Sequence, residues 1–399
     1  MLSKHPDLYT DAELDAWVRH LVDDQVAEGP RLDYKQTISL DSQSDRREAA
    51  KDISSFANEV GGCLVYGIPE KRLPKDRAIP QRPYGIDPIP ELESRLENIY
   101  VDAIKPTLQE WRIQKIELSE YPRKVVYLAW TPESWMGAHM VEAYGDRRYY
   151  RRGQLRAVEM AEHEVRARYE RAAAARDRLD DFLTSAELNY VRHLLPDGFL
   201  SRYVACPVPL AASRIDMRSD RFRAWLRGHQ VPLSQWRPSA YGVRTGLSVR
   251  PSSANWDQYA EIYRNGAFAV WTATVVHQEA DESYTLAYLA ELEALGGFLR
   301  LAKDLYGEIQ YWGALRFLVD IAHKPHPSPT LKFPRLPFPS DWPALMTHDG
   351  ALRIAIDESA ASLARNLNQI LKQLADEMYR AFGYWDATCF DENLNLVRE

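Results

Sequence analysis

The stretch KDISSFANEVGGCLVYGIPE, residues 51–70, decides the fold of the N-terminal half of this chain. Apolar side chains at helical spacing precede a double glycine, so we predict a helix that is capped by Ser44 and ended by Gly61 and Gly62. The stripe consists of Ala49, Ile53, Phe56 and Ala57. The run CLVYGI that follows is apolar throughout and predicts a buried strand. The two together indicate a helix packed on a sheet.

Upstream of this unit the sequence predicts one more helix and one more strand. Thr10 and Glu13 have the spacing of a capping box, and the helix they begin is expected to end near Asp24. Residues 31–38 alternate between apolar and polar side chains, which is typical of a strand with one polar face. Asp33 and Lys35 share that face.

Downstream, the pattern predicts an α+β fold in two parts joined by a helical connector. We expect an N-terminal domain at residues 1–160, a connector at 161–197 and a C-terminal α+β domain at 198–399. The expected elements are strands at 111–118, 124–130 and 147–151, a helix at 91–104, strand-like pieces after Pro196, and helices at 286–294, 299–320 and 358–382.

Composition and charge exclude several classes of protein. The chain has 399 residues, 45% of them hydrophobic, and a net charge of −7, which argues against indiscriminate coating of nucleic acid. No apolar run is long enough to span a bilayer, and the acidic start does not resemble a secretory signal. Three widely separated cysteines make disulfides and structural zinc unexpected. We therefore expect a cytoplasmic protein without membrane association.

Three motifs together resemble a known family. E-x4-D-Y-K at 28–35, D-x-x-S-F-A-N-x-x-G-G-x-L-x-x-G-I at 52–68 and DRRYYRRGQLR at 146–156 are similar to the AlbA-type domain of Schlafen proteins. The resemblance covers roughly residues 10–170. It implies a nucleic-acid-handling domain and, in nuclease-active members, a metal-dependent RNA endonuclease with three carboxylates.

Carried over residue by residue, this resemblance implies Glu28, Asp33 and Glu70 as ligands of Mg²⁺ or Mn²⁺, with Lys35 as the family lysine of the catalytic set. The sequence departs from the family pattern in having Asp as the second acid and Pro69 before the third. The residues themselves agree with this chemistry, because oxygen ligands bind such ions and a lysine neutralises phosphate charge. The alternative is that Glu28 and Glu70 are solvated loop acids and Asp33 pairs with Lys35 on the sheet surface.

The segment RRYYRRGQLR holds five arginines and two tyrosines within ten residues. On a strand each face offers guanidinium groups for phosphate and a ring for stacking, which suits RNA or single strands. We predict nucleic-acid contacts from Arg147, Arg148, Tyr150, Arg151 and Arg152. The alternative is a packed pair of tyrosines flanked by surface arginines. His139 is a further candidate for a general acid or base.

The FAN and double-glycine block admits two interpretations. Phe56 and Ala57 suit a helix core, Asn58 suits a bond to a neighbouring backbone, and the glycines suit a tight turn. A phosphate cradle at Gly61 and Gly62 is the second interpretation. It would support ATP binding, but the chain contains neither GxxxxGK[ST] nor GxGxxG.

The C-terminal half is dense in aromatic residues, which indicate a core, a dimer interface or a ligand pocket. They are Trp256, Tyr259, Tyr263, Phe268, Trp271, Tyr284, Tyr288, Tyr306, Tyr311 and Trp312. Because solvating so many rings is unfavourable, we predict a homodimer formed through residues after 200. The proline-rich segment from His323 is expected to be an extended arm, and the histidines there lack metal-ligand spacing.

Three hypotheses for function follow. The first is a Schlafen-like, divalent-metal-dependent endoribonuclease that cleaves tRNA or another structured RNA, with DNA as a further partner; in a bacterium this would suggest antiviral defence or stress. The second is a non-catalytic DNA- or RNA-binding regulator. The third is a nucleotide-sensing, ATP-binding protein. Convergence of Glu28, Asp33 and Glu70 is required by the first hypothesis only.

Overall fold

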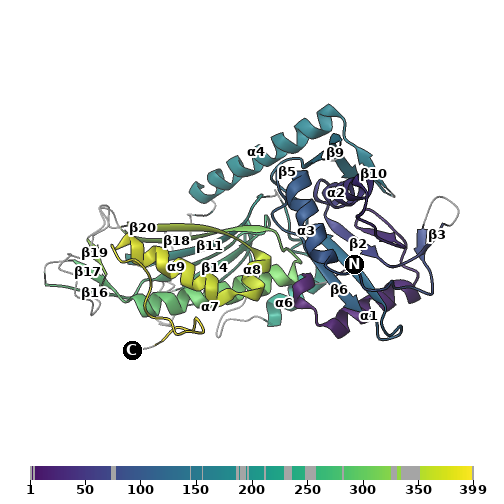
Figure 1. The fold of residues 1–399 in the computed structure, drawn as a ribbon. Coiled ribbons are helices and arrows are strands. Elements are labelled where there is room, and N and C mark those ends of the chain that lie inside the picture. The colour runs from purple at the N-terminus through teal and green to yellow at the C-terminus, as the bar shows by residue number, and fades with distance from the viewer. Residues whose placement is uncertain are drawn as a thin grey trace. The chain divides into compact units, whose positions relative to one another are not determined.

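The fold is taken from a computed structural model of the chain (Figure 1). The structure describes residues 2, 5–72, 78–143, 145–154, 156–185, 188, 195, 197–210, 213–228, 236–247, 258–280, 283–324, 330–333 and 351–397. Internal contacts divide it into two units, Met1–Ala174 and Ala175–Glu399. The boundary lies in α4 (Glu162–Thr184), inside the predicted connector. Both units mix helices with sheets, so the fold class is α+β, as predicted.

The first unit contains a helix, α2, packed against two small sheets. The first sheet has the strand order β1-β2-β7-β6, the second β10-β9-β8-β5, and β3 pairs with β4 in a separate hairpin. The elements are a 3-10 turn at Pro6–Leu8, α1 (Asp11–Asp23), β1 (Leu32–Lys35), α2 (Gln43–Ala57), β2 (Gly62–Tyr66), β3 (Glu70–Arg72), β4 (Ala78–Pro80), α3 (Leu92–Ala103), β5 (Ile104–Lys105), β6 (Arg112–Glu117), β7 (Val125–Thr131), β8 (Met140–Ala143), β9 (Asp146–Arg152) and β10 (Ala157–Glu159).

The predicted helix–strand unit is present, with one correction at its start. The capping residue of α2 is Ser42, whose hydroxyl accepts from the amide of Asp45, and not Ser44. Ser42 is favoured because Asp45 stands three residues later and completes a capping box. At the other end α2 stops at Ala57, and Gly61 has a left-handed φ of 70°. The predicted capping box of Thr10 and Glu13 is confirmed.

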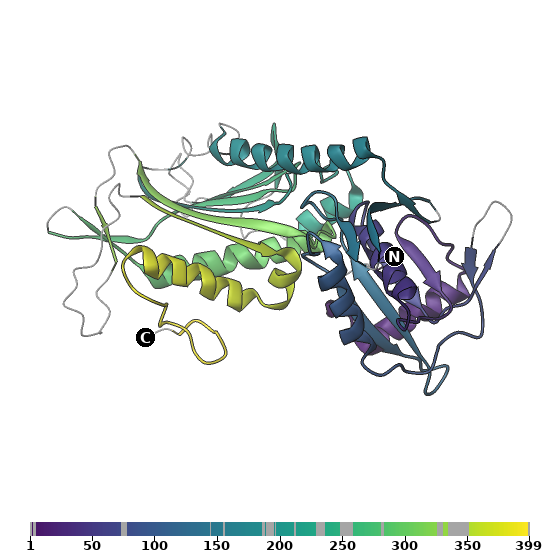
Figure 2. The same ribbon diagram turned by 45° about the horizontal axis from the view of Figure 1, so that its top comes forward.

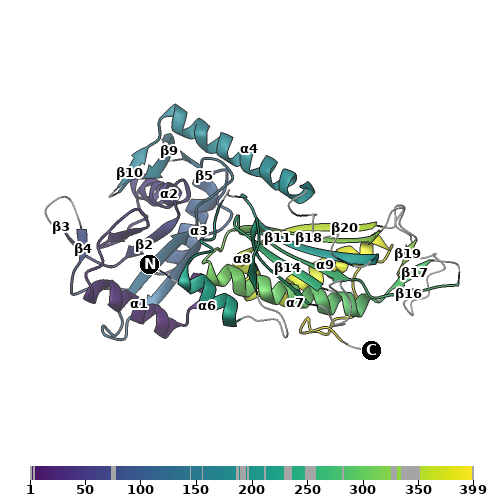
Figure 3. The same ribbon diagram turned by 180° about the vertical axis from the view of Figure 1, so that it is seen from behind.

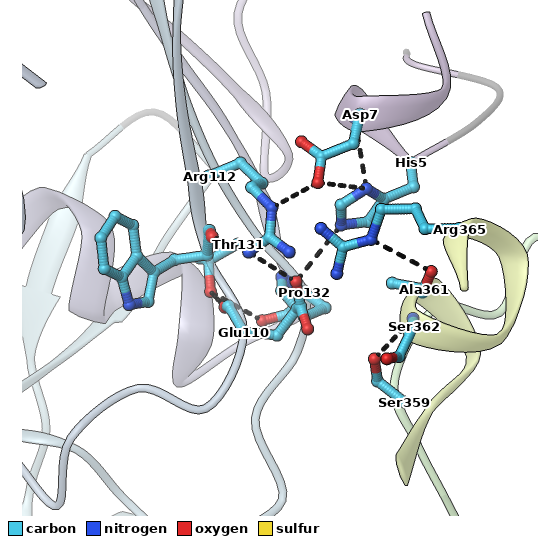
Figure 4. A network of polar contacts seen from close by, with 11 residues as sticks. His5, Asp7, Glu110, Arg112, Thr131, Pro132, Ser359, Ala361, Ser362 and Arg365 are labelled. Carbon is cyan, nitrogen blue, oxygen red and sulfur yellow. Dashed lines mark hydrogen bonds and ion pairs between the residues drawn. The ribbon is translucent and has the colours of Figure 1, made fainter. Parts of the chain in front are cut away.

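The N-terminal 3-10 turn of the first unit is held to the sheet by a small ionic network (Figure 4). Arg112 on β6 donates to Asp7 at 2.7 Å and lies 2.8 Å from Glu110. The ring of His5, which is fully buried, lies 3.3 Å from the same Glu110 carboxylate. Thr131 at the end of β7 donates to the Glu110 carbonyl at 2.9 Å. The chain segment before α1 is therefore fastened to the edge strand β6.

The second unit is a large antiparallel sheet with α7 and α9 on one face and the C-terminal part of α4 on the other. Its seven strands have the order β12-β13-β14-β15-β11-β18-β20, and β16, β17 and β19 form a smaller sheet. The elements are β11 (Gly198–Pro207), α6 (Asp220–Gly228), β12 (Arg237–Pro238), β13 (Gly242–Leu247), β14 (Gln258–Tyr263), β15 (Phe268–Ala273), β16 (Val276–Gln278), β17 (Tyr284–Leu286), α7 (Tyr288–Glu308), β18 (Ala314–Lys324), β19 (Leu331–Lys332), β20 (Ala351–Ser359), α8 (Ala360–Arg365) and α9 (Leu367–Ala381).

Alternation along the strands of this sheet builds two apolar layers. Figures 2 and 3 show α7 and α9 lying along one face of the sheet. Tyr203 of β11 is buried with these helices, whereas Val204, its neighbour in sequence, is buried on the other face with Leu179 and Phe182 of α4. Successive residues of a strand point to opposite faces, so β11 contributes to both layers.

Most of the aromatic residues noted in the sequence lie in these two layers. Tyr259, Tyr263, Phe268, Trp271, Tyr306 and Tyr311 are buried within the unit. Tyr284, Tyr288 and Trp312 are partly exposed, and Trp256 lies outside the described residues. A homodimer was predicted because a monomer was expected to expose many of these rings. Because the unit buries most of them itself, they do not require a partner subunit.

Two helices expected in the C-terminal half differ in the structure. The helix expected at 299–320 is the end of α7 followed by the strand β18, because Leu315, Phe317, Val319 and Ile321 alternate with partly exposed or oppositely facing residues. The terminal helix is broken at Asn366 into α8 and α9. Most of the proline-rich segment predicted as an arm lies outside the described residues.

Two further expectations from composition concern membranes and cysteines. In the described part of the chain, no helix has the length and apolar character to cross a membrane. Cys63, Cys206 and Cys389 are all free and buried. Burial raises the pKa of the Cys63 thiol to about 12, so this thiol is not ionised at neutral pH.

Candidate functional site: paired carboxylates beside a buried arginine

The strand β1 lies at the edge of the first sheet and places two charged residues on its inner face. It runs parallel to β2, with Asp33 opposite Leu64 and Lys35 opposite Tyr66. Leu64 and Tyr66 belong to the core formed with α2, so Asp33 points into that core and is 3% exposed. A buried carboxylate is unfavourable unless other groups compensate its charge.

Glu28 lies beside Asp33 because the loop before β1 folds back on the strand. The amide of Tyr34 donates to Glu28 Oε1 at 2.8 Å, and the amide of Glu28 donates to the carbonyl of Ala78 at 3.0 Å. The carboxyl groups of Glu28 and Asp33 are hydrogen-bonded to each other. This bond requires a shared proton.

The pKa values of the two carboxyl groups shift in opposite directions. Burial, the hydrogen bond with Asp33 and the negative charges of Asp33 and Glu70 raise the pKa of Glu28 well above its ordinary value. Burial opposes ionisation of Asp33 as well, but the bond from Glu28 and the Arg152 guanidinium outweigh it, so the pKa of Asp33 is lowered. Glu28 therefore holds the shared proton and Asp33 carries the negative charge.

Arg152, the last residue of β9, supplies the countercharge to Asp33. Its Nη1 donates to Asp33 Oδ2 at 3.0 Å, and its guanidinium lies 4.9 Å from the centre of the Phe56 ring. The side chain is almost fully buried. Among the described residues, however, Nε and Nη2 of Arg152 have no hydrogen-bond partner. A buried guanidinium with two unused donors has capacity for a further anion.

Lys35 connects Asp33 to a second buried acid, Asp52 of α2. Its ammonium group lies 3.4 Å from Asp33 and 3.8 Å from Asp52, while 43% of the side chain is exposed. Burial raises the pKa of Asp52 to about 6, against the opposing charge of Lys35. Burial would lower the pKa of Lys35, but Asp52 and Asp33 outweigh it, so the lysine stays charged. Lys35 is thus the positively charged side chain of this cluster that is accessible to solvent, whereas Arg152 is buried. We call Glu28, Asp33, Lys35 and Arg152 the paired-acid site.

Glu70 stands apart from this pair. It begins β3 opposite Pro80 of β4, and its carboxylate lies 3.7 Å from Nε of Arg72. Its charge acts on Glu28, but the described residues include no group of three or more Asp, Glu, His or Cys side chains close enough to hold a metal ion. Of the three carboxylates expected to come together around a metal ion, only those of Glu28 and Asp33 are close to each other. The β3–β4 hairpin holds Glu70 beside Arg72 instead.

Residues 28–157 match the family model described as Schlafen, AlbA_2. This stretch is a Schlafen AlbA_2 domain. It lies within the range of 10–170 that the sequence motifs indicated and contains the whole paired-acid site. Among curated proteins, no sequence matches the chain. The family supports a nucleic-acid-related function for this domain.

The arginine-rich strand of the AlbA_2 domain divides between surface and core. Arg147 and Arg148 are exposed, and Arg148 pairs with Glu159 at 3.2 Å. Arg151 is partly exposed and pairs with Glu164. Tyr150 and Arg152, which were expected on an exposed face, are buried instead. The hydroxyl of Tyr150 donates to Asp146 at 2.6 Å, while Arg152 belongs to the paired-acid site. Of the five residues predicted to contact nucleic acid, Arg147, Arg148 and Arg151 therefore reach the surface, and Tyr150 and Arg152 do not.

The FAN and double-glycine block of the AlbA_2 domain has structural functions. Asn58 donates to the carbonyls of His139 and Tyr150, each at 2.8 Å, and accepts from the amide of His139. A Cβ on Gly62 would lie 2.4 Å from the Phe56 ring. The glycine is therefore needed for close packing, and no space remains at that position for a phosphate.

His139 is fully buried in the AlbA_2 domain. Its ring nitrogens lie 2.6 Å from the Pro106 carbonyl and 2.5 Å from the Ser134 hydroxyl. Burial lowers the pKa of His139, so the ring stays neutral. Both nitrogens are engaged in structural bonds, and the expectation of an acid–base role gains no support.

Sequence reasoning missed one residue of the paired-acid site and one residue beside it. Arg152 was predicted as a surface residue, and no part was predicted for Asp52, which lies 3.8 Å from Lys35. The signal for Asp52 was present: it lies three residues after Ala49 and four before Phe56, which places an acid on the apolar face of α2. No comparable local signal marks Arg152 among its neighbouring arginines.

Proposed function

We propose that the AlbA_2 domain is a divalent-metal-dependent endoribonuclease whose reaction takes place at the paired-acid site. One observation carries the proposal: the carboxyl groups of Glu28 and Asp33 lie together beside a buried arginine that, among the described residues, has two donors without a partner. Such an arrangement holds two carboxylates ready for a cation and a guanidinium ready for a phosphate. Structured RNA, with transfer RNA first, is the substrate class that the family resemblance favours.

The donor set fits a Mg²⁺ or Mn²⁺ ion. Two carboxyl groups in contact need a positive charge between them, and a divalent cation can take the place of the shared proton. Mg²⁺ is often bound by one or two carboxylates together with water and substrate phosphate. Glu28 and Asp33 would hold the ion, with Glu70 nearby to add negative charge. When bound, the ion would polarise the phosphodiester and make water a better nucleophile.

The two basic residues would act on the phosphate. Nε and Nη2 of Arg152 are buried, so a phosphate oxygen would reach them only after the side chains that cover them move; the guanidinium would then compensate the negative charge that develops. Lys35 reaches solvent and would neutralise the phosphate as it enters. Binding of the ion also requires Glu28 to lose its proton, so activity should rise with pH.

A second function is favoured by a different observation. Asp33 already pairs with Arg152 at 3.0 Å and with Lys35 at 3.4 Å, so its charge is compensated without a metal. The same residues could therefore stabilise a domain that binds nucleic acid without cleaving it. This regulator hypothesis predicts nucleic-acid binding that depends neither on metal nor on Glu28.

Incubation of the full chain with transfer RNA or plasmid DNA, in Mn²⁺ or in EDTA, distinguishes the two functions. We expect cleavage of the RNA in Mn²⁺ only. Glu28→Gln is the sharpest variant, because its amide oxygen can still accept from Tyr34 and its amide nitrogen can still donate to Asp33. It should slow cleavage by about 100-fold or more. Glu97→Gln, at an exposed position of α3, is the matched control. RNA binding without cleavage under any condition would support the regulator instead.

A further inference from the structure

The second unit contains a pocket of about 600 Å³ beside α6. Its walls come from α6, from β12 and the start of β13, and from Arg264, which follows β14. Four arginines line it, namely Arg218, Arg223, Arg227 and Arg264. Among the lining residues that the structure describes, there is neither Asp nor Glu. In a chain with 57 acidic and 50 basic residues, such a concentration of one charge calls for an explanation.

The four arginines are exposed, and none of their guanidinium groups forms an ion pair within the described part of the chain. Arg221, on the same helix, shows the contrast, because it pairs with Glu308 at 2.7 Å. Arg223 and Arg227 stand four residues apart on α6, where like charges repel each other. Glu261, which is buried, accepts from the hydroxyl groups of the lining residue Ser239 and of Tyr259. The carboxylate of Asp216 accepts from the backbone amide of Arg218 at 2.9 Å, but among the described residues no carboxylate forms an ion pair with the four guanidinium groups.

The remaining wall of the pocket is apolar. Met217, Leu226, Trp236 and Val243 line it, and the half-buried indole of Trp236 packs against the core of the unit. An indole is a favourable surface for a nucleobase, and stacking contributes affinity without sequence preference. A site for inorganic phosphate alone would need neither this wall nor this volume. The volume lies in the range of ordinary small-molecule sites.

We propose that this pocket binds a phosphorylated nucleotide, with the phosphates on the arginines and the base against the apolar wall. Two sources supply this chemistry: a free nucleoside triphosphate, or the 5′-triphosphate end of an RNA strand. Arginine suits both, because its planar donors match phosphate oxygens in pairs. The inference is independent of the nuclease proposal, since it uses residues of the second unit only.

Titration calorimetry of the full chain with GTP, ATP and a short RNA carrying either a 5′-triphosphate or a 5′-hydroxyl tests the site. We expect binding of at least one phosphorylated probe, weakened tenfold or more in Arg223→Ala/Arg227→Ala. Arg221→Ala is the matched control on the same helix and should bind as the wild type does. Trp236→Leu should weaken nucleotide binding more than binding of inorganic triphosphate, because only the former uses the wall.

The arms of the experiment separate the two sources. Equal affinity for GTP and for the triphosphorylated RNA assigns a free nucleotide, and a clear preference for the RNA assigns a strand end. Arg218→Ala/Arg264→Ala, placed outside α6, repeats the test if the helix variant is poorly folded. Absence of binding by every probe at millimolar concentration, or binding unchanged in both double variants, would overturn the proposal. A catalytically inactive Glu28→Gln chain should bind normally, so failure of one proposal leaves the other standing.

Discussion

Arginine has opposite environments in the two units of this chain. In the AlbA_2 domain, Arg152 is buried and lies 3.0 Å from Asp33, so the protein supplies the countercharge itself. In the second unit, Arg223 and Arg227 stand exposed in a pocket whose described lining residues include no acid. Burial makes an unpaired charge very unfavourable, whereas solvent tolerates one. The comparison separates an arginine whose charge the protein itself compensates from arginines whose charge is left to solvent or to a ligand.

The largest expected effect comes from removing the buried countercharge. Asp33→Ala leaves Arg152 buried without its partner, which should lower the free energy of unfolding by about 3–5 kcal/mol. Urea denaturation of the variant and the wild type measures this difference. Asp24→Ala, at an exposed position next to α1, is the control and should change little. A loss below about 1 kcal/mol for Asp33→Ala would mean that the pair does not stabilise the domain.

A smaller effect is expected from the metal. If Glu28 and Asp33 bind Mn²⁺ in the folded state only, the ion stabilises the protein by about 1.4 kcal/mol when it exceeds its Kd tenfold. Thermal unfolding at pH 8 with and without Mn²⁺ measures the gain. Mn²⁺ should stabilise Glu28→Gln much less than the wild type, and it should stabilise Glu97→Gln as much as the wild type. Equal stabilisation of all three proteins would place the ion elsewhere.

The shared proton predicts a dependence of stability on pH. The pKa of Glu28 is higher in the folded than in the unfolded protein, so the stability linked to this group is complete at low pH and is lost as pH rises through the folded value. Glu28→Gln has no such proton. Its melting temperature relative to the wild type should therefore rise between pH 5 and pH 9, by about 2–4 °C for each kcal/mol. A constant difference over this range would contradict the assignment of the proton to Glu28.

The smallest effect on stability is expected in the arginine pocket. Arg223→Ala/Arg227→Ala removes exposed, unpaired charges, so the free energy of unfolding should stay within about 0.5 kcal/mol of the wild-type value. Relief of repulsion between the two side chains favours a slight gain. Urea denaturation without ligand gives the value. A loss as large as that of Asp33→Ala would show that these arginines also maintain the fold, which would remove the contrast between the two regions.

Local patterns in the sequence were sufficient for much of the AlbA_2 domain. The capping box at Thr10, the apolar stripe of α2 and the alternation around Asp33 each depend on neighbours within a few residues. The same reasoning was wrong for β18, because its apolar residues follow those of α7 with only a short connection and the change of period was missed. A helix or strand could be predicted where a capping residue or a clear change in the spacing of apolar residues marks its end. The boundary between α7 and β18 could not, because the apolar residues of the two elements follow each other almost without a break.

The candidate site was only partly predictable because it is assembled from distant segments. Glu28, Asp33 and Lys35 are close in sequence, and their motif identified them. Arg152 reaches Asp33 from a strand 119 positions later, and one arginine among several neighbours carries no local mark of burial. The separation of Glu70 from the pair likewise depends on the β3–β4 hairpin and its ion pair with Arg72. The positions of Arg152 and Glu70 therefore depend on contacts between segments that are distant in the sequence, which local patterns do not reveal.

The distance along the chain between Asp33 and Arg152 has a consequence for the order of synthesis. The carboxylates of the site are made early, but the arginine that compensates Asp33 emerges only when β9 has been translated, and Asn58 joins the same strand by a bond to Tyr150. Contacts of such long range form late, because the intervening chain must first be closed. A nascent or truncated chain that ends before residue 152 therefore lacks the complete site. Its assembly marks the point at which the domain has folded as a whole.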